Sequence, residues 1–162
     1  MDVRQDYMTL PFLFLASVVI SAGDDSPNTI AFMSRKADSI VVATVANDPV
    51  SGGSAPISNI LYPRRYEFIA GIEHVLKGKL EPNSKIYVFA RRIERTTDEL
   101  PVKKGQRVIL FLIPSDDKPL FLPLPQDDTL TTWTAVDAWF GVSPYSEGLE
   151  AALSGKLDFI TR

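Results

Sequence analysis

The chain has 162 residues, a net charge of −3 at pH 7 and no cysteine. This length predicts one domain, and an apolar share of 45% is enough for a hydrophobic core. The lack of cysteine excludes disulfides, thiolate nucleophiles, thiolate metal sites and lipid-modified cysteines. The charge argues against nucleic-acid or anionic-membrane partners, because binding to phosphates depends on clustered Lys and Arg.

Residues 1–23 are interpreted as a signal peptide, followed by a single domain over residues 24–162. Residues 9–20 are apolar, a length that suits the hydrophobic region of a signal peptide and is too short to cross a bilayer. The segment before them has more acidic than basic residues, so a buried strand or helix is the alternative. The signal predicts a periplasmic or extracellular protein with no transmembrane segment after its removal.

The domain is expected to open with a short helix. Ser26 is an N-cap candidate, and Pro27 suits the first helical position, where its missing N–H costs nothing. The helical spacing of apolar residues continues to about Ala37. Residues 39–46 are rich in β-branched side chains and predict the first strand, whereas residues 50–63 predict a loop.

Residues 64–77 predict the strand around which the other elements are organised. Apolar and polar residues alternate there, as in a half-buried strand. Fourteen residues would span about 45 Å, so we expect the strand to bend and to pair with different neighbours at its two ends. Gly71 marks the predicted bend, because glycine within a strand often accompanies a bulge or a barrel corner.

A bulge is predicted in the second half of this strand. Ile72 and Val75 cannot face the same side of a regular strand, because side chains alternate. One extra residue near Glu73 or His74 would let both apolar side chains point inward.

Four further strands are expected. Residues 85–90 alternate, and residues 107–113 are apolar at nearly every position, which indicates a central strand covered on both faces. Residues 120–124 and 130–136 are predicted to form a hairpin, with the first strand at an edge because it contains prolines.

A closing amphipathic helix is predicted from Ser143-Pro144, a second N-cap and N1 pair, to Gly155. Its apolar stripe consists of Tyr145, Leu149, Ala152 and Leu153. Together the elements predict a mainly β protein. We expect a five- to six-stranded antiparallel OB-like barrel with a short N-terminal helix and a C-terminal amphipathic helix.

Three segments carry a resemblance to known proteins: residues 37–45 (ADSIVVATV), 75–78 (VLKG) and 104–112 (KGQRVILFL). They resemble uncharacterised exported bacterial proteins with an OB-like barrel, which is similar to the barrel of tissue inhibitors of metalloproteinases and netrin modules. The resemblance implies a fold and an exported location. Those inhibitors act through an N-terminal cysteine that binds zinc, and this chain has none, so no functional residue is implied.

Arginines form the first candidate binding group: Arg64, Arg65, Arg91, Arg92 and Arg95. If the strands that carry them pair as a hairpin, their guanidinium groups would gather and bind a carboxylate, a phosphate or an acidic partner bidentately. A solvated strand end, balanced by Glu94, Asp98 and Glu99, is the preferred interpretation.

Aromatic residues form the second candidate group: Trp133, Trp139, Phe140 and Tyr145. On the surface they would be a hot spot for a protein or sugar partner. In the core they would close one end of the barrel beneath the last helix, and this interpretation is preferred because large aromatic residues are mostly buried.

His74 is the only histidine and therefore the only imidazole base. No G-x-S-x-G motif accompanies it, so a structural position on the strand is preferred to a catalytic one. The adjacent carboxylates lie at Asp24-Asp25, Asp116-Asp117 and Asp127-Asp128, without the spacing of a calcium loop. They are interpreted as turn caps, and no metal or cofactor is expected.

The leading functional hypothesis is a non-enzymatic exported module that binds a protein or envelope component or has a structural role. A small hydrolase that uses His74 is the alternative. An OB-type binder of single-stranded nucleic acid is the second alternative, against which the acidic charge balance argues. The oligomeric state is left open.

Overall fold

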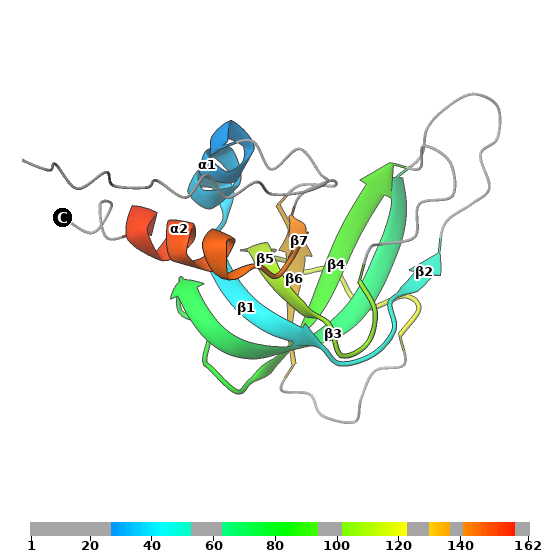
Figure 1. The fold of residues 1–162 in the computed structure, drawn as a ribbon. Coiled ribbons are helices and arrows are strands. Elements are labelled where there is room, and N and C mark those ends of the chain that lie inside the picture. The colour runs from blue at the N-terminus through cyan, green and yellow to red at the C-terminus, as the bar shows by residue number, and fades with distance from the viewer. Residues whose placement is uncertain (1–26, 53–62, 94–101, 123–129, 137–140, 158–162) are drawn as a thin grey trace, which may run out of the picture.

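The residues that the structure describes form a closed barrel of five strands, with two further strands and two short helices outside it (Figure 1). The structure, a computed structural model, describes residues 27–52, 63–93, 102–122, 130–136 and 141–157. The predicted signal peptide lies outside these residues. The described elements are α1 (Pro27–Lys36), β1 (Ser39–Val45), β2 (Val50–Gly52), β3 (Pro63–Lys77), β4 (Lys85–Ile93), β5 (Arg107–Pro114), β6 (Thr131–Ala135), β7 (Val142–Pro144) and α2 (Glu147–Leu157).

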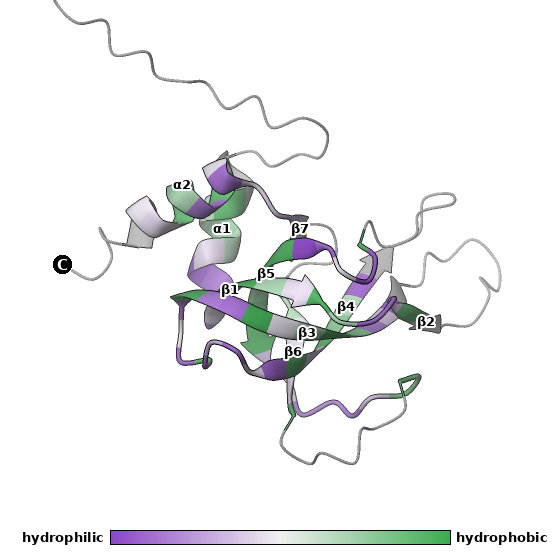
Figure 2. Cartoon of the chain, turned by 60° about the horizontal axis from the view of Figure 1, so that its bottom comes forward, coloured by the Kyte–Doolittle hydropathy of each residue, from purple (hydrophilic) through white to green (hydrophobic). Residues whose placement is uncertain are grey.

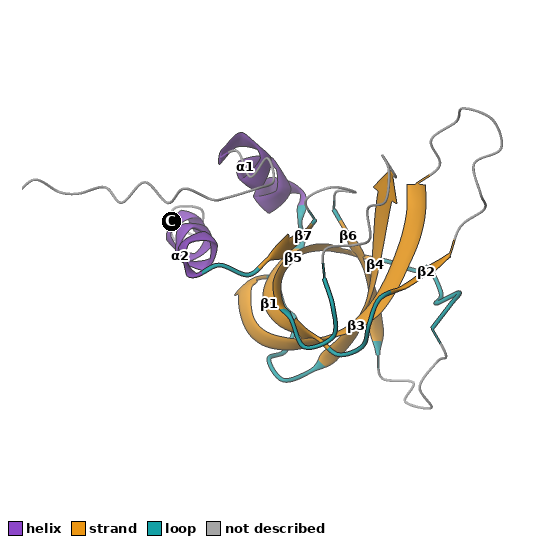
Figure 3. Cartoon of the chain, turned by 45° about the vertical axis from the view of Figure 1, so that its right-hand side comes forward, coloured by secondary structure: helices purple, strands orange, loops and turns teal. Residues whose placement is uncertain are grey.

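The barrel strands follow the order β1-β3-β4-β6-β5, and β5 pairs with β1 to close the ring that Figure 3 shows end-on. The predicted mainly β barrel with a helix near each end of the chain is therefore confirmed. One expectation is wrong: β4 and β6 run parallel, from Ile86 opposite Thr131 to Phe89 opposite Thr134. The other barrel pairs are antiparallel, as predicted.

β3 pairs with different barrel strands at its two ends, as its length predicted. Its residues up to Gly71 pair with β4, and its residues from Ala70 onward pair with β1. The register with β1 skips Glu73 and then Leu76, so the predicted bulge is present and a second one follows it. Ile72 and Val75 both contact the barrel interior, which confirms the reason for expecting a bulge.

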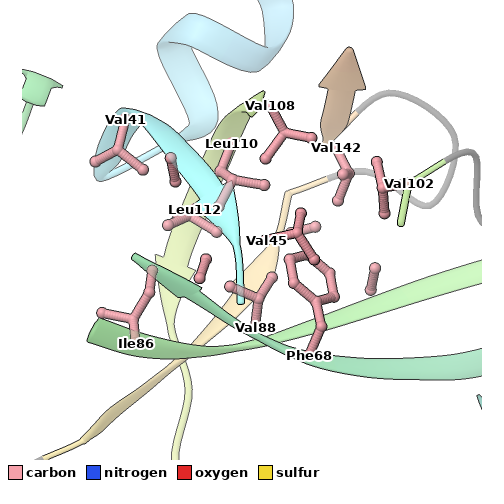
Figure 4. Packing of buried hydrophobic residues seen from close by; sticks show 14 of the residues in the cluster. Val41, Val45, Phe68, Ile86, Val88, Val102, Val108, Leu110, Leu112 and Val142 are labelled. Carbon is pink, nitrogen blue, oxygen red and sulfur yellow. The ribbon is translucent and has the colours of Figure 1, made fainter. Parts of the chain in front are cut away.

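The barrel interior is filled by apolar side chains from every barrel strand (Figure 4). Phe68 of β3, Val88 of β4 and Leu110 of β5 are fully buried there. Figure 4 shows these side chains pointing toward one another between the strands. Their alternation with outward residues follows from the period of two along each strand.

A second apolar cluster lies outside the barrel, between β1, β5 and the two helices. Ile109 and Phe111 of β5 belong to it, whereas their neighbours on the same strand face the interior. Met33 of α1 and Leu153 of α2 cover them and are fully buried. In Figure 2 both helices carry hydrophobic residues beside hydrophilic ones, as amphipathic helices do. β5 is therefore apolar on both faces, as predicted.

The predicted hairpin of residues 120–124 and 130–136 is wrong. Leu120, Phe121 and Leu122 are not in a strand, and β6 pairs with β4 and β5 instead. The physical reason is that a side-chain carboxylate, Glu67, accepts the backbone N–H groups of these three residues. Donors that are bonded to a carboxylate cannot take part in a strand ladder.

The last helix starts later than predicted. Ser143 and Pro144 belong to β7, which pairs with β5, and Ser146 caps the helix by accepting the N–H of Leu149 at 3.1 Å. Of the predicted apolar stripe, Ala152 is exposed. The helix also continues past Gly155 to Leu157, and β2 occupies the start of the segment that was expected to be a loop.

Replacing Gly78 by alanine is expected to lower the free energy of unfolding by about 1–3 kcal/mol. Gly78 has a φ of 98°, and a Cβ there would lie 2.7 Å from the carbonyl oxygen of Asp38. Urea denaturation followed by circular dichroism measures the loss. Gly155→Ala is the control, because a Cβ at that helical position meets no atom within 4 Å. Equal stability of the two variants would contradict this role of Gly78.

Candidate binding surface

The two strands that carry the candidate arginines pair as the sequence hypothesis required. Arg64 lies opposite Arg92, and Arg65 lies opposite Arg91. β6 pairs with β4 only as far as Phe89, and the β3–β4 ladder continues beyond that residue. We call the continuing part, residues 63–66 and 90–93, the arm (Figure 1). Arg95 lies outside the described residues.

The arm divides the arginines between its two faces. Residues that are paired across a ladder share a face, and neighbours along a strand alternate. Arg65 and Arg91 therefore share the face of Glu67, whereas positions 64 and 92 belong to the other face. The two pairs of positions therefore do not share one face of the arm.

Arg65 is held in place by several partners. Its Nε donates to Glu67 Oε1 at 2.8 Å, and its other nitrogens contact Asp117 at 3.3 Å and the carbonyl oxygen of Lys118 at 2.8 Å. The guanidinium also lies 4.1 Å from the centre of the Phe89 ring. Arg65 thus fastens the loop after β5 to the arm and has little capacity left for a ligand.

Glu67 is the central side chain of this surface and is fully buried. Its carboxylate accepts the backbone N–H groups of Leu120 at 3.0 Å, Phe121 at 2.9 Å and Leu122 at 3.2 Å. Burial raises the pKa of Glu67, but these donors and the Arg65 guanidinium outweigh burial and hold the pKa below its usual value. Glu67 is therefore charged and fixes the positions of residues 120–122.

The loop that Glu67 holds presents two large apolar side chains to solvent. Leu120 is 67% exposed and Phe121 is 39% exposed. The Phe121 ring rests on Gly52 of β2, since a Cβ at that glycine would lie 2.0 Å from a ring atom. Val50 is also exposed and lies opposite Glu67 in the β2–β3 ladder, so it shares this side of the sheet.

Arg91 supplies a positive charge beside these apolar residues. Its side chain is 60% exposed, and its nearest acidic partner, Asp117, lies 3.8 Å away. We call the surface formed by Val50, Arg91, Lys118, Leu120 and Phe121 the arm face. Of these five residues, the sequence analysis identified only Arg91 as a candidate for binding. Leu120 and Phe121 were interpreted as part of an edge strand, and Glu67, which holds them, looked like an ordinary outward residue.

His74 belongs to a separate network of hydrogen-bonded side chains between α2 and the barrel. Its Nδ1 lies 3.0 Å from Glu150 Oε1, and Tyr145 donates its hydroxyl to Glu150 Oε2 at 2.7 Å. Arg107 lies 3.8 Å from the centre of the Tyr145 ring and donates to Glu73 at 2.8 Å. The Tyr145 hydroxyl and then His74 lower the pKa of Glu150. Within the described ranges the ring of His74 bonds to this carboxylate and to no hydroxyl nucleophile.

The two described members of the predicted aromatic group, Trp133 and Tyr145, lie in different apolar clusters. Trp133 packs against the barrel interior, and its Nε1 donates to Thr131 Oγ1 at 2.8 Å. Tyr145 packs against the outer cluster beneath the helices instead. Trp139 and Phe140 lie outside the described residues.

In the described part of the chain, no group of three or more His, Cys, Asp or Glu side chains could hold a metal ion. Of the adjacent carboxylates, Asp117 contacts both Arg65 and Arg91, so it has an electrostatic partner already. The pairs at 24–25 and 127–128 lie outside the described residues. Neither described helix is long and apolar enough to cross a membrane.

Glu67→Gln is expected to destabilise the protein by about 1–3 kcal/mol, because an amide offers one acceptor oxygen to donors that now share two. The exchange of the amide hydrogens of Leu120, Phe121 and Leu122 should also become faster. Hydrogen exchange read by NMR measures this local effect. Glu81→Gln, an exposed change in the turn after β3, is the matched control. Unchanged protection at the three amides would rule out the proposed role of Glu67.

The contribution of Glu67 to stability should depend on pH in a defined direction. Its folded pKa lies below the ordinary value of 4.5, so the stabilisation is fully present above that value and is lost as the pH falls through the folded pKa. The difference in unfolding free energy between the wild type and Glu67→Gln should therefore shrink between pH 6 and about pH 3. Urea titrations at each pH measure it, and a difference that stays constant would contradict a charged Glu67.

No protein-family model matches the chain, and no curated protein matches it either. The arm face combines exposed apolar side chains, the largely exposed Arg91 side chain and a loop that Glu67 holds through its backbone N–H groups.

Proposed function

We propose that the protein is a non-enzymatic binding module whose arm face binds a protein partner. The main observation behind this proposal is that the fully buried carboxylate of Glu67 binds the backbone N–H groups of Leu120 and Phe121, whose side chains are exposed. Apolar side chains that cluster on a surface typically mark an interaction site. A rigid loop raises affinity, because less conformational freedom is lost when the partner binds.

The partner segment is proposed to be acidic as well as apolar. Arg91 extends beside the apolar residues with most of its side chain exposed, and Lys118 adds a second positive charge. A guanidinium binds a carboxylate through two parallel hydrogen bonds, which gives both affinity and orientation. A segment with carboxylates next to Leu or Phe side chains would complement the arm face.

Fold analogy supports this location. In OB-like barrels the second and third barrel strands and the loops beside them commonly form the ligand-binding surface. In this chain those strands are β3 and β4, and residues 115–122 form one of the adjacent loops. A nucleic-acid ligand is disfavoured, because Glu67 and Asp117 already partner Arg65 and the chain is acidic overall.

Export is part of the same proposal. A signal peptide at residues 1–23 would place the module in the periplasm or outside the cell, where its partner would be an envelope or extracellular protein. The hydrolase alternative, which requires His74 to activate a nucleophile, has no geometric support in the described residues, where that ring bonds to Glu150.

Peptides selected from a random phage-displayed library on the full chain are expected to combine Asp or Glu with Leu, Ile or Phe. Affinity measured by fluorescence anisotropy should fall at least tenfold in Phe121→Ser and in Arg91→Glu, as for hot-spot residues. Phe32→Ser is the matched control, since Phe32 of α1 is at least as exposed as Phe121 but lies outside the arm face. Peptides that bind all three variants as tightly as the wild type would overturn the proposal.

A further inference from the structure

A cavity of about 370 Å³ lies at the opposite end of β3 from the arm. The turn after β3 forms one wall, with Gly78, Lys79 and Leu80. Pro114 of β5 and Trp133 of β6, which are neighbours in the β5–β6 ladder, form another wall. This volume falls within the range of small-molecule sites, roughly 300–1,000 Å³.

The walls of the cavity are mainly apolar and well supported. Trp133 and Leu80 pack against the barrel interior and are only partly buried, so each also contributes to the cavity. The indole N–H of Trp133 is already bonded to Thr131, which leaves the ring itself as the surface offered to a ligand. An aromatic ring binds flat apolar molecules through stacking.

One polar group stands out in this lining. Ser39 is 2% exposed, and its hydroxyl makes no hydrogen bond to another described residue. A buried hydroxyl without a partner is costly, so such groups are normally bonded to protein, water or a ligand. Gly78 lies directly beside this hydroxyl with no room for a side chain, because a Cβ there would lie 2.2 Å from Ser39 Oγ.

The charges around the cavity are balanced. Asp38 and Lys79 are both exposed and have opposite sign, so neither an anionic nor a cationic ligand is favoured. We propose that this cavity binds a small neutral molecule with a flat apolar ring and one hydroxyl or amide group. The ring contacts Trp133, Leu80 and Pro114, and the polar group bonds to the Ser39 hydroxyl.

The probe for this proposal is 2-naphthol, a flat, neutral ring system with one hydroxyl, titrated into the full ¹⁵N-labelled chain and followed by NMR. Saturable shifts are expected at the amides of Ser39 and Gly78 and at the Trp133 indole N–H, with Phe121 unaffected. Ser39→Ala should weaken binding about three- to tenfold, which corresponds to one neutral hydrogen bond. Leu80→Glu should weaken it more than tenfold, because it places a charge in an apolar wall.

Lys79→Gln is the control, since it removes a rim charge that a neutral ligand does not use, and affinity should stay within twofold. The proposal is overturned if the shifts do not saturate, if they lie outside the cavity, or if Ser39→Ala and Leu80→Glu bind 2-naphthol as tightly as the wild type. The readout depends on neither the arm face nor its peptide partner, so the two proposals fail separately.

Discussion

The buried carboxylate of Glu67 is the interaction on which the functional surface depends. Removing a charge from water costs several kcal/mol, and the cost is offset only when the charge is fully hydrogen-bonded. Here the backbone N–H groups of Leu120, Phe121 and Leu122 and the guanidinium of Arg65 provide that compensation. Since these partners come from residues 120–122 and from β3 itself, the requirement to satisfy one charge determines where residues 120–122 lie.

β3 makes this arrangement possible because it is longer than the barrel requires. Its second half pairs with β1, and the bulge at Glu73 lets both Ile72 and Val75 contact the barrel interior. Its first half continues past Phe89, the last residue of β4 that pairs with β6, and it carries Arg65 there and Glu67 at the boundary, opposite Phe89. A single strand therefore contributes both to the core and to the arm, with Gly71 between the two parts.

The strands and the barrel could be predicted because the period of two is a local property of the sequence. The same reasoning located the bulge at Glu73 and the paired arginines of the arm. It failed where long-range contacts decide the structure. Glu67 has the same pattern as an ordinary outward residue of an alternating strand, and nothing local shows that a loop about fifty positions later covers it. Pro144 was a reasonable helix start by composition, but β7 pairs with β5 at that point and the helix begins after Ser146.

The two proposed sites differ in how much they rely on the barrel being rigid. The cavity near Ser39 is lined by residues of β1, β5 and β6 and by the turn after β3, so its shape follows from the packing of the core. The arm face lies where the ladder has left the barrel, and its order comes from polar contacts instead of apolar packing. Polar contacts to one buried charge weaken together when that charge is neutralised, whereas core packing does not depend on that group. Conditions that protonate Glu67 should therefore loosen the arm face and leave the cavity intact, so the same molecule would keep one binding site while losing the other.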